Sequence, residues 1–227
     1  MIDFENKLQI GTGCYTAPEI AHILQMPYSK VRRWMVDYWD GKLGKEFSNK
    51  YSWKVDNSRA VSFHTLIEFY VMMQLSEVGV KPKEVFKAHQ KLASDFNTAF
   101  PFAQKKLLEG IKTDGKTIFL TLGEDTISLD GSNQLNLVLI KKFFKNLDFD
   151  DEEVAKRFWP LGKNKSIVID PERKFGHPII DGFNIYPEVL FNHYKAGDPI
   201  NYLAAVYNIS NKEIRDAIDY CTLSKAA

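Results

Sequence analysis

The chain has 227 residues, of which 44% are hydrophobic and 26% charged, and its formal net charge is +1 at pH 7. This composition is typical of a globular protein and excludes an intrinsically disordered chain. A net charge so close to zero gives no whole-molecule attraction to polyanions, so any nucleic-acid binding must come from a local basic patch.

The sequence also indicates a compartment. The first ten residues, MIDFENKLQI, lack a basic segment followed by an apolar one, and no apolar run is long enough to span a bilayer. The two cysteines, Cys14 and Cys221, stand far apart and in no metal-like spacing, which argues against a disulfide scaffold. We therefore expect a cytoplasmic protein without membrane contact.

Two short helices are predicted between residues 15 and 39. Thr16 and Glu19, in the stretch TAPE, form a capping box at the start of the first helix, and Pro27 ends it by disfavouring helical geometry at Met26. Ser29 can cap the second helix. The expected inward face of that helix is Val31, Trp34, Met35 and Tyr38. Its expected outward residues are Lys30, Arg33 and Asp37, with Arg32 on the flank.

Glycine, asparagine and serine punctuate short aromatic stretches in residues 40–61, and this pattern predicts a small β-hairpin or wing. Ser62 then opens a strongly apolar helix that Gly79 ends. Pro82 begins another helix, which runs to about Phe96.

Residues 98–162 are predicted to form an α/β connector. TDGK is a turn, TIFLTL and TISL are strands, and LNLVLIKKFFKNL is a helix. The acidic run from Asp148 to Glu153 suits the solvated first turn of a helix, where acids favour the helix dipole. The same carboxylates could alternatively hold a divalent cation.

Residues 163–227 are predicted to form a module of one short strand, SIVIDP, and three helices. Pro187 opens the first helix and Gly197 closes it, Asp198 caps the second, and a capping box from Ser210 to Glu213 opens the third. From Asp198 onward this segment holds three cations and four acids, which disagrees with DNA reading. Its apolar stripe suits dimerisation or a protein partner, or alternatively forms a second small core; the stripe comprises Ile200, Leu203, Val206, Ile209, Ile214 and Ile218.

The helix, turn and helix near the N-terminus match the pattern of a helix-turn-helix, whose second helix enters the major groove. Residues 26–59 contain eight cations and four acids, so this stretch carries +4 and the remaining residues sum to −3. Arginine can bond guanine bidentately. The alternative is a solvated helix face on which Arg33 pairs with Asp37. This stretch alone leaves both interpretations open.

The predicted wing adds further cations with aromatic residues between them. Its cations could contact phosphates, which position a protein without reading sequence. Alternatively, Phe47, Tyr51 and Trp53 form the small core of a hairpin that the lysines keep soluble. We prefer this second interpretation for Tyr51 and Trp53. The wing cations are Lys42, Lys45, Lys50, Lys54 and Arg59.

Signals of an enzyme are poor. The five histidines are scattered without a carboxylate at metal-ligand spacing, and neither cysteine belongs to a nucleophile motif. The GTG at residues 11–13 lacks the later glycine of a dinucleotide fingerprint and the lysine of a P-loop. We expect no catalysis, no cofactor and no metal.

Two stretches carry a resemblance. YTAPEIAHILQMPYSKVRRWM followed by VSFHTLIEFYVMMQLSEVGVKPKEVFKAHQKL resembles a MerR-like helix-turn-helix with its downstream helices. IVIDPERKFGHPIIDGFNI with GDPINYLAAVYNISNKEIRDAIDYC resembles a small helical domain family of unknown function. Together, joined by a segment that contains PFA, they are similar to bacterial antitoxins of the VapB type, over nearly the whole chain.

This resemblance implies a DNA-binding antitoxin that neutralises a PIN-type ribonuclease toxin and represses their shared promoter as a complex. We expect a homodimer, because operators usually mirror the two-fold symmetry of the protein that binds them. It implies a mainly α (α+β) fold, with a MerR-like winged helix-turn-helix at 1–97, the connector at 98–162 and a helical module at 163–227. The chain lacks the metal-binding cysteines or drug pocket that MerR-type sensors often carry. The expected DNA-binding residues are Thr16, Ser29, Lys30, Arg32, Arg33, Lys42, Lys45, Lys50, Lys54 and Arg59.

Two other interpretations stay open. The protein could be a stand-alone MerR-like regulator that answers a small ligand and has no toxin. It could also be an adaptor whose helix-turn-helix modules serve only protein contacts, in which case salt would not affect any DNA affinity.

Overall fold

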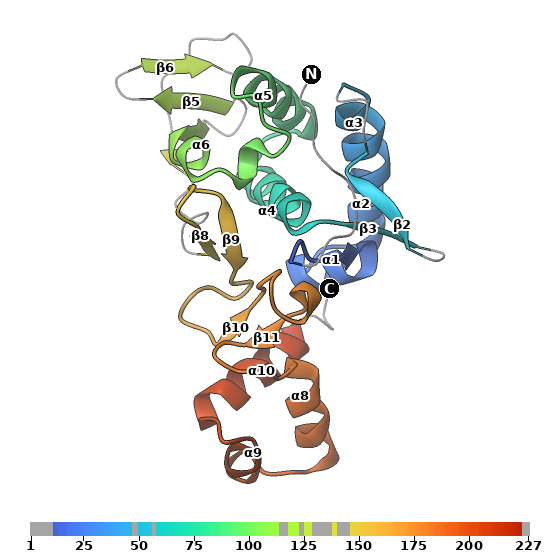
Figure 1. Ribbon diagram of the computed structural model, residues 1–227, viewed down its shortest axis with the longest axis vertical. Helices are drawn as coiled ribbons and strands as arrows, with labels where there is room; N and C mark the ends of the chain where they lie inside the picture. Colours follow the sequence, from blue (N-terminus) through green and yellow to red (C-terminus); the bar gives the residue numbers. More distant parts are fainter. Residues whose placement is uncertain are drawn as a thin grey trace.

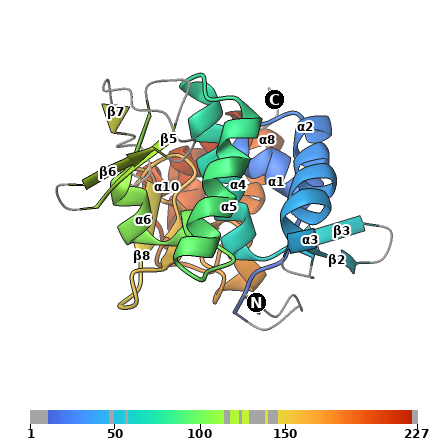
Figure 2. The same ribbon diagram turned by 90° about the horizontal axis from the view of Figure 1, so that it is seen from above.

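The computed structural model describes residues 11–46, 50–55, 58–113, 118–122, 125–128, 138–139 and 146–223. The fold is mixed α+β, with small antiparallel sheets among the helices. Figure 1 shows an elongated molecule in which the C-terminal helices form a separate lower part. Figure 2 looks down on the larger part, where helices α4 and α5 lie between the first helices and the middle strands.

The chain begins with strand β1 (Tyr15–Thr16), helix α1 (Ala17–Leu24) and helix α2 (Tyr28–Arg33). The predicted capping box is confirmed, because the Thr16 amide and hydroxyl both donate to Oε2 of Glu19, at 2.7 and 2.6 Å. The predicted role of Ser29 is wrong. Pro27 is the N-cap of α2, so Ser29 already lies inside the first turn.

Helix α2 continues directly into a π-helical segment, η1 (Trp34–Leu43), and then into α3 (Gly44–Glu46). The prediction of a hairpin from residue 40 is therefore wrong for residues 40–46. A Cβ at Gly41 would lie 2.9 Å from the carbonyl oxygen of Val36, so glycine permits the close approach that this helical segment makes there.

The hairpin itself is shorter than predicted. It consists of β2 (Ser52–Val55) and β3 (Ser58–Val61), and β1 pairs with the other edge of β3, which gives the sheet order β1-β3-β2. Phe47 lies outside the described residues. Helices α4 (Phe63–Glu77) and α5 (Pro82–Asp95) follow, with Ser62 as the N-cap of α4, as predicted.

The middle of the chain contains η2 (Pro101–Ala103), α6 (Lys105–Gly110), and a four-stranded sheet in the order β6-β5-β4-β7. The predicted strands are confirmed in β5 and β6, but Val138–Leu139 pairs with β4 as a strand, so the predicted helix over 135–147 is wrong there. Leu147 also lies in a strand, while residues 135–137 and 140–145 of that predicted helix and most of TDGK lie outside the described residues. The strands are β4 (Ile111–Thr113), β5 (Ile118–Leu122), β6 (Asp125–Ser128) and β7 (Val138–Leu139).

The acidic run begins within strand β8 (Leu147–Phe149) and continues through the turn that leads to strand β9 (Ala155–Phe158), so the predicted helix start is wrong. Asp150 closes this turn, because its Oδ1 accepts from the amides of Glu152 and Val154 at 3.0 and 2.9 Å. Cross-strand pairing of the flanking residues therefore overrides the helical preference of the acids.

The C-terminal part contains the three predicted helices, and its predicted strand pairs with a second strand that was not predicted. Gly197 closes the first helix with φ +106°, and the Ser210–Glu213 capping box opens the third. Pro199, not Asp198, is the N-cap of the second helix. The elements are β10 (Ile167–Val168), η3 (Lys174–Gly176), β11 (Ile179–Ile180), α8 (Pro187–Ala196), α9 (Ile200–Tyr207) and α10 (Asn211–Leu223).

Two main hydrophobic cores underlie these parts. The first extends from Tyr15 to Ile169 and includes Phe102 and Leu107 of the predicted connector. The second is built from β10, β11 and helices α8, α9 and α10. Within the described part of the chain, no helix is both long and apolar enough to cross a membrane.

The predicted C-terminal stripe is largely part of the second core. Leu203, Ile209 and Ile214 are buried there, and Ile200 and Ile218 are half-buried. Val206 is the exception, with 57% of its surface exposed. The alternative of a second small core therefore describes most of this stripe.

Candidate nucleic-acid interface

The turn between α1 and α2 is fixed by its backbone. Gln25 caps α1 in the left-handed conformation, with φ 52° and ψ 46°, and the amide of Met26 donates to the carbonyl of Ala21 at 2.9 Å. Met26 is 5% exposed, so its side chain anchors the turn in the core. The backbone bond of Met26 and its buried side chain therefore fix the direction of α2 relative to α1.

Helix α2 presents cations on one side and packs its other side into the core. Val31 and Trp34 are fully buried, as predicted, whereas Arg32 and Arg33 are exposed. Among the described residues, neither arginine forms an ion pair, so the alternative pairing of Arg33 with Asp37 is not made. Nζ of Lys30 lies 5.1 Å from the centroid of the Trp34 ring, which places this cation on the flank of the helix.

The predicted wing cations fall on two different elements. Lys42 belongs to η1 and Lys45 to α3. Nζ of Lys42 lies 5.0 Å from the centroid of the Tyr38 ring. Lys50 precedes β2, and Lys54 lies within it; both are exposed. Only Lys50 and Lys54 thus accompany the hairpin as predicted, together with Arg59.

Arg59 is engaged inside the protein. Its guanidinium lies 3.0 Å from Oδ2 of Asp40, and its Nε donates to Oγ of Ser52 at 2.7 Å. The amide of Ser52 donates to Oδ1 of Asp40 at 2.9 Å. This network joins the hairpin to the π-helical segment. The sequence pattern does not predict this network, because it places Asp40 in the hairpin or wing and not in the helical segment that holds it.

Thr16 and Ser29 differ in what they can offer a ligand. The hydroxyl of Thr16 already donates to Glu19, so it serves the helix cap. Ser29 is exposed in the first turn of α2, next to Tyr28, which is 51% exposed and was not predicted as a site residue. The exposed face of α2 is therefore formed by Tyr28 and Ser29 in its first turn and by Arg32 and Arg33 at its end.

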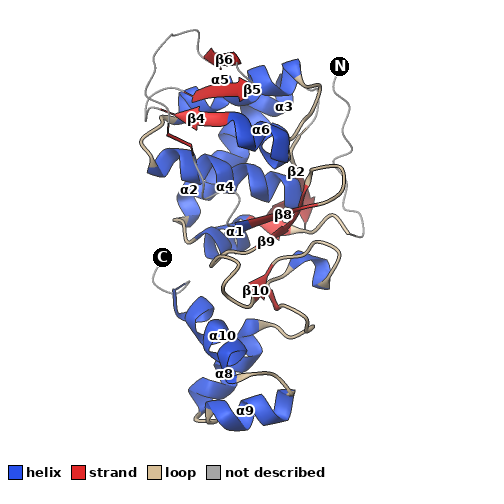
Figure 3. Ribbon diagram, turned by 90° about the vertical axis from the view of Figure 1, so that its left-hand side faces the viewer, coloured by secondary structure: helices blue, strands red, loops and turns tan. Residues whose placement is uncertain are grey.

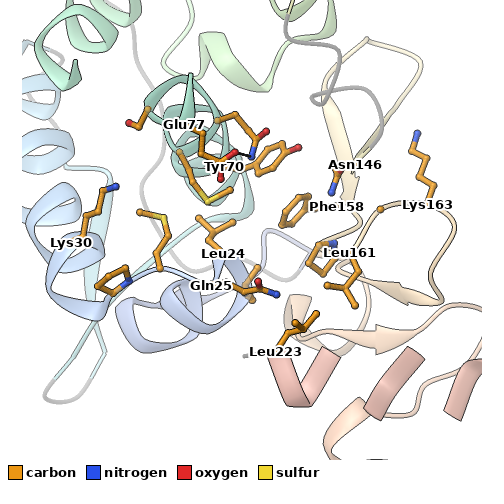
Figure 4. Close-up of a pocket in the computed structure, with 18 of the residues that line it drawn as sticks. Leu24, Gln25, Lys30, Tyr70, Glu77, Asn146, Phe158, Leu161, Lys163 and Leu223 are labelled. Carbon is orange, nitrogen blue, oxygen red and sulfur yellow. Dashed lines mark hydrogen bonds between the residues drawn. The ribbon is translucent and has the colours of Figure 1, made fainter. Parts of the chain in front are cut away.

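A large cavity lies behind this turn. Its volume is about 1040 Å³, and it is bordered by the end of α1, by α4, by β9 and by the end of α10. Figure 4 shows Leu24 and Gln25 of the turn below Tyr70 and Glu77 of α4. Phe158 and Leu161 border the cavity on the right of this view, and Leu223 lies below Gln25. Lys30 also borders this cavity.

One pair of ionisable side chains, His89 and Glu68, is buried in the first core. Nε2 of His89 lies 2.8 Å from Oε2 of Glu68, and both side chains are buried. Burial raises the pKa of Glu68, and the amide of Phe102 donates to its other oxygen at 2.9 Å. Burial likewise raises the pKa of the Cys14 thiol. Within the described ranges, no three histidine, cysteine or acidic side chains are grouped to hold a metal ion.

Comparisons with known proteins agree with this architecture. Residues 167–221 match the family described as "Protein of unknown function (DUF433)". The chain is 24% identical over 82 residues to a protein of Mycobacterium tuberculosis (strain ATCC 25618 / H37Rv) named "Putative antitoxin VapB45". That alignment covers 36% of this chain and 34% of the relative, so the match spans about a third of the relative's length.

A solved structure has the same fold over nearly the whole chain. The X-ray crystal structure of Rv2018 from Mycobacterium tuberculosis superposes with a TM-score of 0.69 and covers 95% of this chain and 100% of that one. The identity is 16%, so this likeness concerns the fold.

Proposed function

We propose that this protein is a DNA-binding antitoxin of a type II toxin–antitoxin pair. It would repress its own promoter as a homodimer and neutralise a PIN-type ribonuclease toxin. The observation that carries the DNA-binding role is the exposure of Arg32 and Arg33, which form no ion pair within the described part of the chain. The other side of their helix is anchored in the core by Trp34. The similarity to the putative antitoxin supports the toxin partner.

In this proposal, α1 and α2 act as the helix-turn-helix of a MerR-like winged module. The exposed face of α2 would face the base edges, with Arg32 and Arg33 as candidates for guanine contacts. Lys50 and Lys54 would contact phosphates beside the hairpin. Arg59 would act indirectly, because its bonds to Asp40 and Ser52 hold the hairpin against the π-helical segment η1.

The direct test is binding to the DNA just upstream of the reading frame, measured by fluorescence anisotropy at two salt concentrations. We expect salt-dependent binding by the wild type, because cations that contact phosphates release counterions. The double variant Arg32→Ala/Arg33→Ala should lose roughly 1–3 kcal/mol for each arginine that reads a base.

A matched control removes two exposed cations elsewhere. Lys83 of α5 and Lys106 of α6 are both exposed, and neither belongs to α2 or to the hairpin. Lys83→Ala/Lys106→Ala changes the net charge equally and should bind like the wild type. If the arginine variant binds as well as this control, α2 does not read DNA. If no protein binds DNA, the adaptor function replaces the proposal.

A further inference from the structure

A second cavity, of about 350 Å³, lies where helix α1 meets the beginning of the C-terminal module. Figure 3 shows α1 directly above β10 and the C-terminal helices, at the junction of the two parts. Tyr15, Pro18 and Pro178 supply apolar walls to this cavity. Its size is within the range of cavities that bind small molecules.

Two carboxylates give this cavity its charge. Glu19 comes from α1 and Glu188 from the first turn of α8, and no lysine or arginine is among its described lining residues. Oε2 of Glu19 accepts the two bonds from Thr16, while Oε1 lies 3.7 Å from Nδ1 of His177. Glu188 is exposed and has no hydrogen bond or ion pair within the described part of the chain. Glu188 is therefore the lining carboxylate for which the described structure supplies no partner, whereas Glu19 keeps Thr16 and His177 beside it.

Two further polar atoms at this junction have no hydrogen bond within the described structure. They are Nε2 of the half-buried His22, which lines the cavity, and the hydroxyl of Tyr15, which lies against Gly13 and Gly176. Tyr15 is only 2% exposed, and burial raises the pKa of its hydroxyl well above the usual value, so this group stays neutral. Buried polar atoms normally have partners, so unsatisfied atoms beside a cavity point to a missing ligand or water.

We propose that this cavity binds a small organic cation, an amine with an apolar body. The carboxylates of Glu19 and Glu188 would face the ammonium group, and the tyrosine ring and the two prolines would contact the apolar body. Because Glu19 belongs to α1 and Glu188 to α8, such a ligand touches both parts of the protein at once. This site is separate from the exposed face of α2, so ligand binding does not depend on the proposed DNA contact.

The experiment titrates the full chain with three probes of one shape and different charge: benzylammonium, benzyl alcohol and benzoate. Backbone amide resonances report both the affinity and the location. We expect benzylammonium to bind most tightly and benzoate most weakly, with shifts centred on residues 17–24 and 177–188. The variant Glu188→Gln should weaken benzylammonium binding roughly threefold and leave benzyl alcohol unaffected, because it removes one partly exposed charge.

The matched control is Glu152→Gln, which removes an exposed carboxylate from the β8–β9 turn and should bind all three probes like the wild type. The proposal is overturned if benzyl alcohol binds as tightly as benzylammonium, if the shifts centre elsewhere, or if no probe binds. It is also overturned if Glu188→Gln and Glu152→Gln bind benzylammonium equally well.

Discussion

Helices α1 and α2 and helices α9 and α10 are built on the same backbone plan. Gln25 and Asn208 cap the first helix of each pair with the same dihedral angles, φ 52° and ψ 46°. The next residue, Met26 or Ile209, is buried in both turns. The amides of these two residues donate to the carbonyls of Ala21 and Ala204, five residues earlier in each case.

The two pairs differ in charge at equivalent positions of their second helices. Counted from the turn, Arg33 of α2 corresponds to Asp216 of α10; the arginine is exposed, whereas the aspartate is buried. Asp216 accepts hydrogen bonds from Lys165 and Lys212, at 2.9 and 2.7 Å. At this position the first pair thus presents an exposed cation, whereas the second pair presents an acid that binds two lysines. The position of Arg32, by contrast, holds an exposed arginine in both pairs, because its equivalent in α10 is Arg215. The helix-turn-helix shape alone therefore does not identify a DNA-binding face.

The largest expected effect concerns the anchor of α2. Trp34 is fully buried against Trp39 and Phe69, whereas the equivalent position of α10 is Ala217. Trp34→Ala should lower the free energy of unfolding by about 3–5 kcal/mol, because it removes a large side chain from a packed core. Urea unfolding followed by circular dichroism measures this loss. A loss below about 1 kcal/mol would show that α2 is not anchored as described.

The second prediction concerns Asp216, in the helix pair α9 and α10. Asp216→Ala removes the acceptor for Lys165, Lys212 and the amide of Ser166, and should destabilise the C-terminal module by about 1.5–3 kcal/mol. The two lysines remain partly exposed to water, which limits the cost. Hydrogen exchange of the α8 and α10 amides should accelerate while α4 is unaffected. Equal acceleration in both regions would contradict separate cores.

The same carboxylate predicts a pH dependence. Burial by itself would raise the pKa of Asp216, but hydrogen bonds from Lys212, Lys165 and Ser166 together hold it below the usual value. Its stabilising contribution is therefore present above about pH 4 and lost as the pH falls through the lowered pKa. Asp216→Asn should flatten the acid dependence of C-terminal hydrogen exchange. An unchanged acid profile in this variant would assign that dependence to other groups.

The smallest effects concern the two turns. A left-handed conformation costs a residue with a Cβ roughly 1–2 kcal/mol, and glycine avoids this at some cost in chain entropy. Gln25→Gly should therefore stabilise the protein by about 0.5 kcal/mol. Asn208→Gly should gain less, since asparagine tolerates this conformation. Urea midpoints of the two variants test the ranking, and a larger gain at Asn208 would reverse it.

Local chemistry predicted the elements whose cause lies within a few residues. The capping boxes at Thr16 and Ser210, the stop at Pro27 and the closing residue Gly197 were all readable, because each acts on the helix next to it. The buried face of α2 was readable for the same reason, since helical spacing alone places Val31 and Trp34 together.

The tertiary structure decided the features that join distant residues. Asp40 lies in a helix and bonds Arg59 across the hairpin, the strand at Val138 needs β4 as its partner, and Glu19 meets Glu188 only because two separate cores pack together. Sequence spacing carries no information on such contacts, because their free energy depends on segments far apart in the chain. The charge of each helix was therefore visible in the sequence, but whether that charge is free or paired was settled only by folding.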